Sequence, residues 1–325
     1  MIGRRGLLGG IAGAGFARAV RAQAPVRLRV STAAPPGDFL AKSLEAFKAE
    51  VEGADIGVKV ETYPASSLFK QGAEIQALQR GNLEMSTMTT FEVAQQLPEF
   101  GFFNRGYLLR DPAHLGLVFD GPIGAEYRAI VAERMGIEIL ATAYLGTRHV
   151  GLRQKRSVKG PADFAGVKLR MPAGPEWLLL GRVLGVSPVP LGMPEVYLAL
   201  KTGTIDGQEN PLSIVNAAKL YEVSEQIVLT AHMIQPVFIN VAKPVWDKLS
   251  AAQQQAVQAA ARKAAAGNDA GRLADEATIA AALAGRGLAV EAIDAAPFRA
   301  LADLVYAEAA KGWNGEWMRR VAAAA

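Results

Sequence analysis

The 325-residue sequence contains no cysteine and only three histidines, His114, His149 and His232. Without cysteine the chain can form no disulfide, no thiolate metal site and no cysteine nucleophile. Three widely spaced histidines leave few ligands for zinc, so no metal and no cofactor are predicted. No segment offers the ~18 or more consecutive apolar residues that a transmembrane helix requires. These absences argue against a thiol enzyme, a zinc enzyme and an integral membrane protein.

An excess of one charge is also missing once the first 24 residues are set aside. The formal net charge is +4, but Arg4, Arg5, Arg18 and Arg21 supply it, and no acidic residue accompanies them. The remainder of the chain holds 31 basic and 31 acidic residues. A neutral chain without a basic stripe has nothing to neutralise phosphates, so no nucleic-acid partner is predicted.

The first 24 residues have the organisation of an export signal. A basic beginning is followed by a short apolar run over residues 7–17, and Ala22-Gln23-Ala24 matches an A-x-A cleavage site. We therefore predict export to the periplasm with cleavage near Ala24. The route is Sec or, because of Arg4-Arg5, the twin-arginine pathway.

The remaining chain alternates between period-two and helical spacing of its apolar residues. Such alternation predicts an α/β protein whose mostly parallel sheets are flanked by helices. The predicted strands are 26–32, 56–64, 85–90, 137–146, 167–171, 186–190, 204–208, 225–242 and 288–293. The predicted helices are 37–52, 72–80, 112–135 with a break at Gly121-Pro122, 176–184, 194–201, a long helix from 250 to beyond 280, and 297–324.

Two long elements suggest that this α/β protein has two lobes. The apolar stretch 225–242 is long enough to run between two sheets, and Ser250 with Gln253 forms a capping box at the start of an alanine-rich helix. At 1.5 Å per residue that helix measures ~45 Å, which is enough to brace two small domains. We predict lobe I from 25–146 plus about 236–275, lobe II from 147–235 plus about 276–325, and a hinge between them.

One pair of short motifs raises the alternative of a serine acyl enzyme. Ser67 and Lys70 form an S-x-x-K, and Lys201-Thr202-Gly203 is a K-T-G in the order found in penicillin-recognising enzymes. The K-T-G, however, ends a predicted helix with Gly203 in the C-cap region, and no S-D-N lies between the two motifs. The enzyme therefore stays a remote alternative.

Three polar residues are candidates for binding an anion. Arg170 lies at the end of the strand VKLRM (167–171), where a guanidinium is either solvated or directed into a cleft. Arg148 also follows a predicted strand, and its other interpretation is a solvated edge residue. Asn210 precedes Pro211 at the predicted opening of a helix, so it either caps that helix or faces an anion near Arg170.

At these residues the chain resembles the DctP-type solute-binding proteins of tripartite ATP-independent periplasmic (TRAP) transporters. The segment EVYLALKTGTIDGQENP (195–211) is highly specific for that family. The other segments that carry the resemblance are PASSLFKQGAEIQALQRGNLEM (64–85), AYLGTRHV (143–150), DFAGVKLRMP (163–172) and the long helix after AKPVWDKLS (242–250).

The resemblance implies two α/β lobes that close on a small organic acid. It also implies that Arg170 forms a two-point pair with the ligand carboxylate and that Arg148 and Asn210 contact the ligand. Asp38 stands in the first loop, where many relatives carry a polar residue near the ligand. Trp177, which follows the Pro175 turn, and Thr90 complete the predicted set of ligand contacts.

The function that the resemblance implies is a periplasmic receptor. It is expected to be monomeric or weakly dimeric and to deliver an organic acid to the small and large membrane subunits of a TRAP permease. The alternative is a ligand-sensing receptor for a membrane sensor kinase.

Overall fold

The computed structural model describes residues 25–324 of the chain. The predicted export signal, residues 1–24, lies outside the described residues. Within 25–324 no helix is both long enough and apolar enough to span a bilayer.

Nine strands of the described chain form one mixed sheet in the order β2-β1-β3-β8-β4-β7-β5-β6, with β9 pairing β8. The strands are β1 Val26–Ser31, β2 Val58–Tyr63, β3 Met85–Met88, β4 Ile137–Leu152, β5 Lys168–Met171, β6 Ser187–Pro190, β7 Gly207–Pro211, β8 Gln226–Ala242 and β9 Ala289–Ala292. The helices are α1 Phe39–Gly53, α2 Glu74–Gln79, α3 Thr90–Ala94, α4 Pro112–Phe119, α5 Pro122–Met135, α6 Pro175–Leu184, α7 Val196–Thr202, α8 Leu212–Ala217, α9 Lys243–Trp246, α10 Ala251–Glu276, α11 Ile279–Gly285, α12 Ala296–Ala309 and α13 Gly315–Ala323.

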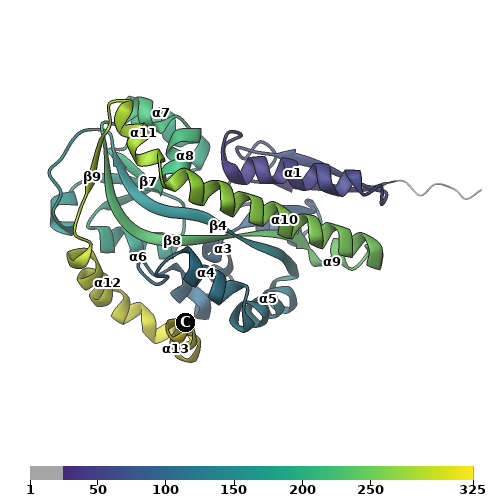
Figure 1. Ribbon diagram of the computed structural model, residues 1–325. Coiled ribbons are helices and arrows are strands. Elements are labelled where there is room, and N and C mark those ends of the chain that lie inside the picture. Colours follow the sequence, from purple (N-terminus) through teal and green to yellow (C-terminus); the bar gives the residue numbers. More distant parts are fainter. Residues whose placement is uncertain (1–24, 325) are drawn as a thin grey trace, which may run out of the picture.

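The sheet has a parallel part at each end, joined by two long antiparallel strands. β1 runs parallel to β2 and β3, while β5 runs parallel to β6 and β7. Between these parts, β4 and β8 pair antiparallel along their lengths, and Figure 1 shows them running through the middle of the molecule. We call the part around β1–β3 and α1–α3 the β1 lobe, and the part around β5–β7 and α6–α8 the β5 lobe. This confirms the predicted two-lobed α/β fold, while the exact lobe boundaries stay a prediction.

β4 is longer than the sequence pattern predicts. It continues past residue 146 to Leu152, with irregular pairing against β8 near Tyr144 and Gly146. Such irregularities bend a strand and strengthen its twist. Gly146 has φ +125°, and a Cβ there would lie 2.5 Å from the Cβ of Pro211, so glycine is needed where the end of β7 lies beside β4. The predicted strand ends at residue 146, because glycine at this position interrupts the apolar alternation.

β7 and α8 also differ from the prediction. The strand spans Gly207–Pro211 instead of 204–208, and α8 begins after Pro211, at Leu212. Asn210 therefore pairs with His149 of β4 inside the sheet and is not a helix N-cap. The turn residues Asp206-Gly207 and the Asn-Pro pair suggested a loop, but pairing with both β4 and β5 makes this segment a strand.

The long helix α10 packs against α1 of the β1 lobe, against β4, and against α8 of the β5 lobe (Figure 1). Its 26 residues begin with the predicted capping box of Ser250 and Gln253, and at 1.5 Å per residue they extend roughly 39 Å. The prediction that this helix continues past residue 280 is wrong. It ends at Glu276, and α11 starts at Ile279 to pack on α8 and β9. Alanine favours helix on both sides of the break, so the pattern does not reveal it.

The predicted C-terminal helix is likewise two helices. α12 packs on α6 of the β5 lobe, whereas α13 turns back to an aromatic cluster beside the β1 lobe. Trp317 of α13 meets Phe100 edge-on with ring centroids 5.0 Å apart. Because α12 and α13 pack on different parts of the sheet, the C-terminal segment ties the two lobes together.

Candidate functional site

A cavity lies between the two lobes, with about 800 Å³ of empty space that is partly open to solvent. The polar residues that line it from the β1 lobe are Thr32, Gln71, Glu74, Thr87, Thr89 and Glu92. The β5 lobe contributes Arg170, Pro172, Trp177, Met193 and Asn210, and the long strands add Arg148, Gln235, Leu145 and Val237. A ligand held here touches both lobes, so its binding favours their closed arrangement.

Arg170 lines the cavity from β5 and is 1% exposed. Its Nε donates to the Leu191 carbonyl at 2.8 Å, and its Nη2 donates to Gln71 Oε1 at 3.2 Å. Within the described chain no carboxylate lies at ion-pair distance from this guanidinium. Burial lowers the pKa of Arg170 to about 10, which still leaves it charged at neutral pH. The solvated alternative for Arg170 is therefore wrong, and a buried cation faces the cavity without a counter-ion.

Arg148 lines the same cavity from β4, and it differs from Arg170 because it has a counter-ion. Its Nη2 donates to Glu209 Oε1 at 2.7 Å, its Nε donates to Glu209 Oε2, and its Nη1 donates to Gln235 Oε1 at 2.8 Å. Its guanidinium also lies over the Trp177 ring, 5.1 Å from the centroid. Arg148 is 3% exposed, so the interpretation as a solvated edge residue is wrong.

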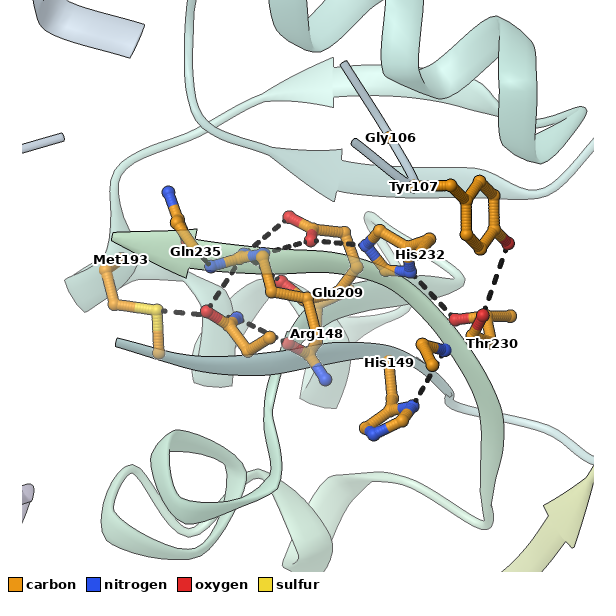
Figure 2. Close-up of polar contacts among 12 residues, drawn as sticks. Gly106, Tyr107, Arg148, His149, Met193, Glu209, Thr230, His232 and Gln235 are labelled. Carbon is orange, nitrogen blue, oxygen red and sulfur yellow. Dashed lines mark hydrogen bonds and ion pairs between the residues drawn. The ribbon is translucent and has the colours of Figure 1, made fainter. Parts of the chain in front are cut away.

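Glu209 and His232 continue this polar network behind Arg148 (Figure 2). His232 Nε2 lies 3.1 Å from Glu209 Oε2, and the other ring nitrogen lies 2.8 Å from Thr230 Oγ1. Burial favours the neutral acid, but Arg148 and His232 hold the pKa of Glu209 below its usual value. Burial lowers the pKa of His232, so a neutral ring that donates from Nε2 fits the contacts. Neither residue was predicted for the site, because nothing in the local sequence marks them as partners of Arg148.

Asn210 and Trp177 complete the β5-lobe wall beside the two arginines. Asn210 Oδ1 accepts from Arg148 Nη2 at 3.2 Å, and its Nδ2 donates to Gln208 Oε1. The Trp177 ring stacks on Phe91 of α3, with centroids 3.8 Å apart and planes 7° from parallel. This stack joins the β5 lobe to the β1 lobe at the edge of the cavity.

Two of the predicted ligand contacts do not line the cavity. Asp38 caps α1 by accepting from the Leu40 backbone N–H at 3.0 Å and pairs with Arg272 of α10. Arg272 is fully buried and needs this carboxylate as its counter-ion. Thr90 donates to Asn104 Oδ1 at 2.6 Å, while the cavity is lined by its neighbour Thr89. We therefore remove Asp38 and Thr90 from the candidate site.

Gln71 lines the cavity and is not among the residues predicted from the sequence. Its Oε1 accepts from Arg170 Nη2 at 3.2 Å and from the Met193 backbone N–H at 2.9 Å. The side chain thus reaches from the β1 lobe to two donors of the β5 lobe. No signal in the sequence shows this contact, because Gln71 and Arg170 are 99 residues apart.

The serine-enzyme motif has no catalytic geometry in the fold. Ser67 and Lys70 are exposed and do not line the cavity. Lys201 lies in the last turn of α7, and Gly203 ends that helix with φ +74°. The prediction that this K-T-G is a helix C-terminus is confirmed.

The family model of the bacterial extracellular solute-binding proteins, family 7 (DctP), matches residues 30–312 of the chain. The chain belongs to this family. A solute-binding protein of Verminephrobacter eiseniae (strain EF01-2) is 36% identical over 279 residues, which make up 85% of this chain and 82% of that protein.

Two solved structures are similar to this family member over nearly the whole chain. A TRAP periplasmic solute-binding protein from Roseobacter denitrificans with bound 3-deoxy-D-manno-oct-2-ulosonic acid is 38% identical, with a TM-score of 0.88, covering 93% of this chain and 100% of that chain. A second, from Polaromonas sp. JS666 and bound to D-erythronate, is 29% identical, with a TM-score of 0.86 and coverages of 92% and 99%.

These comparisons confirm the resemblance that the sequence segments indicate. The chain is a solute-binding receptor of the TRAP class, and this function is supported over a sensor-kinase receptor or a serine acyl enzyme. The family consists of periplasmic binding proteins, in agreement with the predicted export.

Proposed function

We propose that this protein captures one small organic acid by its carboxylate, with Arg170 as the anchor, and delivers it to the small and large membrane subunits of a TRAP permease. It acts as a monomer or weak dimer. The carboxylate enters the cavity between the lobes and binds Arg170, while Arg148, Asn210 and Trp177 shape the same wall. Two relatives in this family were solved with a carboxylic acid bound, which supports the class of ligand.

The observation that carries the proposal is the missing counter-ion of Arg170. Three arginines of the described chain are buried, namely Arg148, Arg170 and Arg272. Arg148 pairs with Glu209 and Arg272 pairs with Asp38, but Arg170 has only uncharged acceptors. Leaving a cation buried without an anion is costly, so this site is built for a charge that arrives with the ligand. A guanidinium also fits a carboxylate at two points and fixes its plane.

Binding assays on Arg170 variants test the proposal. A thermal-shift panel of mono-, di- and keto-acids identifies ligands, because binding to the folded state alone raises its apparent stability. Calorimetry then compares Arg170→Lys and Arg170→Ala with wild type. We expect both variants to lose roughly 2–5 kcal/mol of binding free energy, since lysine restores the charge but not the two-point geometry.

The control is Arg182→Lys, because Arg182 is exposed on α6 and does not line the cavity. This variant should bind as wild type. Wild-type affinity in Arg170→Lys would rule out a two-point contact between Arg170 and the ligand carboxylate. Wild-type affinity in Arg170→Ala would rule out Arg170 as the anchor.

Export and the absence of chemistry on the ligand belong to the same proposal. The mature protein is expected to begin near Pro25, and intact-mass measurement of periplasmic material tests this. A membrane-bound chain that retains Arg4 and Arg5 would contradict it. No acyl enzyme is expected, and a covalent β-lactam adduct at Ser67 would contradict that expectation.

A further inference from the structure

The charged residues that line the cavity are divided between its two lobes. Arg148 and Arg170 come from β4 and β5, whereas Glu74 and Glu92 come from α2 and α3 of the β1 lobe. No other lining residue of the described chain carries a charge. If one ligand carboxylate lies on the arginines, the opposite part of that ligand lies against two acidic side chains.

Glu74 is the more deeply buried of the two acids, with 6% of its surface exposed. Its Oε2 accepts from the Gly72 backbone N–H at 2.7 Å, and no basic side chain of the described chain lies within ion-pair distance. Glu92 is held by two hydrogen bonds from Thr89: its Oε2 accepts from the Thr89 backbone N–H at 2.8 Å and from the Thr89 hydroxyl. Neither acid has a basic partner within the described chain, but Glu74 is the more deeply buried, and no side chain donates a hydrogen bond to its carboxylate.

The strands packed against α2 bring no positive charge to Glu74. The strands packed against α2 are β3, which has no titratable residue, and β8, whose His232 is engaged by Glu209. Burial and the nearby carboxylate of Glu92 raise the pKa of Glu74 to about 7. The arginines of the opposite wall do not reverse this rise. Near neutral pH the side chain thus exists both as a carboxylate and as a carboxylic acid.

Glu74 is expected to bind a ligand hydroxyl much more favourably than a second ligand carboxylate. A ligand hydroxyl can donate to the carboxylate or accept from the acid, so it binds in either protonation state. A second ligand carboxylate meets like charge in a poorly solvated space, and it binds only if a proton is taken up. The hydroxyls of Thr32 and Thr87, which lie 2.8 Å apart in the same cavity, offer further uncharged partners for a polyol chain.

We infer that this receptor selects acids with a single carboxylate and hydroxyl groups at the far end, and that Glu74 is the residue that rejects a second carboxylate. The inference rests on the proposed function, because it assumes that Arg170 holds the first carboxylate.

The test uses pairs of probes that differ only in their terminal group. D-erythronate with meso-tartrate and D-gluconate with D-glucarate are such pairs, because the second member of each carries a carboxylate where the first carries a hydroxymethyl group. Calorimetry at about pH 8, above the pKa of Glu74, measures the affinity ratio within each pair. We expect wild type to prefer the monocarboxylate of the pair that fits by at least about tenfold.

Glu74→Gln should reduce that preference to less than about threefold, mainly by improving binding of the dicarboxylate, because the like charge is gone. In wild type the preference should also shrink at about pH 6, where Glu74 is protonated, and the glutamine variant should lack this pH effect. Glu133→Gln is the matched control, since Glu133 is exposed on α5 and does not line the cavity.

The outcomes separate this inference from the proposed function. An unchanged ratio and pH response in Glu74→Gln, with Arg170→Ala still abolishing binding, overturns the role of Glu74 alone. Wild-type binding in Arg170→Ala overturns the anchor instead. A wild-type preference for the dicarboxylates, or binding of neither probe pair by a folded protein, overturns the inferred ligand class.

Discussion

Glu209 of β7 and Arg148 of β4 form a two-point ion pair in which the carboxylate side chain is fully buried and the guanidinium side chain is 4% exposed. The pair holds the Arg148 guanidinium in the wall of the cavity, and the Glu209 carboxylate neutralises its charge. Arg170, the other arginine of that wall, keeps its charge available. The cavity thus contains one arginine that is neutralised by the protein itself and one that we propose as the ligand anchor.

Glu209→Gln should destabilise the ligand-free protein strongly. The change keeps the shape of the side chain but leaves Arg148 buried without an anion, and breaking such a pair typically costs about 3–5 kcal/mol. Urea unfolding of the ligand-free protein measures the loss. Glu61→Gln is the control, because Glu61 pairs with Arg27 at the surface, where removal typically costs less than about 1 kcal/mol. Equal losses in the two variants would contradict the structural role of the buried pair.

Gln71→Glu should weaken ligand binding while stabilising the empty protein. The new carboxylate occupies the place of the Gln71 amide oxygen, which already contacts Arg170 Nη2. An internal anion then competes with the ligand carboxylate for the same guanidinium. We expect an affinity loss of at least about tenfold in calorimetry, or ~1.4 kcal/mol.

The melting temperature of empty Gln71→Glu should rise, because Arg170 gains a counter-ion. Gln76→Glu adds the same charge on the exposed face of α2 and should leave affinity unchanged. If Gln71→Glu binds as tightly as wild type, Gln71 is not next to the carboxylate site.

Asn210→Asp should lower affinity with little effect on folding. Asn210 Oδ1 accepts from Arg148, and aspartate keeps that acceptor. The added charge faces the incoming ligand anion in a buried wall. The amide donor to Gln208 Oε1 is lost, but the Gln208 side chain can turn so that its unpaired Nε2 donates to the new carboxylate, which keeps the fold intact. We expect at least about a tenfold loss in affinity and a melting temperature near wild type.

Asn314→Asp is the control for that substitution, because Asn314 caps α13 and aspartate caps a helix about as well. Unchanged affinity in Asn210→Asp would show that Asn210 only supports Arg148.

The stability of the ligand-free protein should fall as pH rises because of Glu74. Its folded pKa of about 7 exceeds the ordinary value of 4.5, so the folded protein holds a proton that the unfolded chain has released. Stability from this group is complete below about pH 4.5 and is lost as pH rises through about 7, by roughly 3 kcal/mol in total.

Urea unfolding at about pH 5.5 and pH 8 tests this dependence. The difference between the two free energies should be smaller in Glu74→Gln than in wild type, and Glu133→Gln should behave as wild type. Identical pH dependence in wild type and Glu74→Gln would mean that Glu74 titrates normally in the folded protein.

The sequence alone determined the class of fold and the family, and it singled out Arg170 as the candidate anchor. Alternating apolar patterns predicted the strands and most of the helices of both lobes, because burial on one face repeats every second or every third to fourth residue. The short helix α3 was not predicted. The capping box at Ser250 and the helix end at Gly203 were also visible, since capping depends on neighbours in the chain. Arg170 was found from its strand and from the family segments around it.

The tertiary structure decided which polar side chains meet. Glu209 neutralises Arg148, Asp38 neutralises Arg272, and Gln71 reaches Arg170 across the cavity. Each of these partners lies far from the other in the chain, so no local pattern records the contact. The strand containing Asn210 and the end of α10 at Glu276 were likewise set by what those segments pack against. Charge pairing and burial depend on distances in space, and only the folded chain fixes those distances.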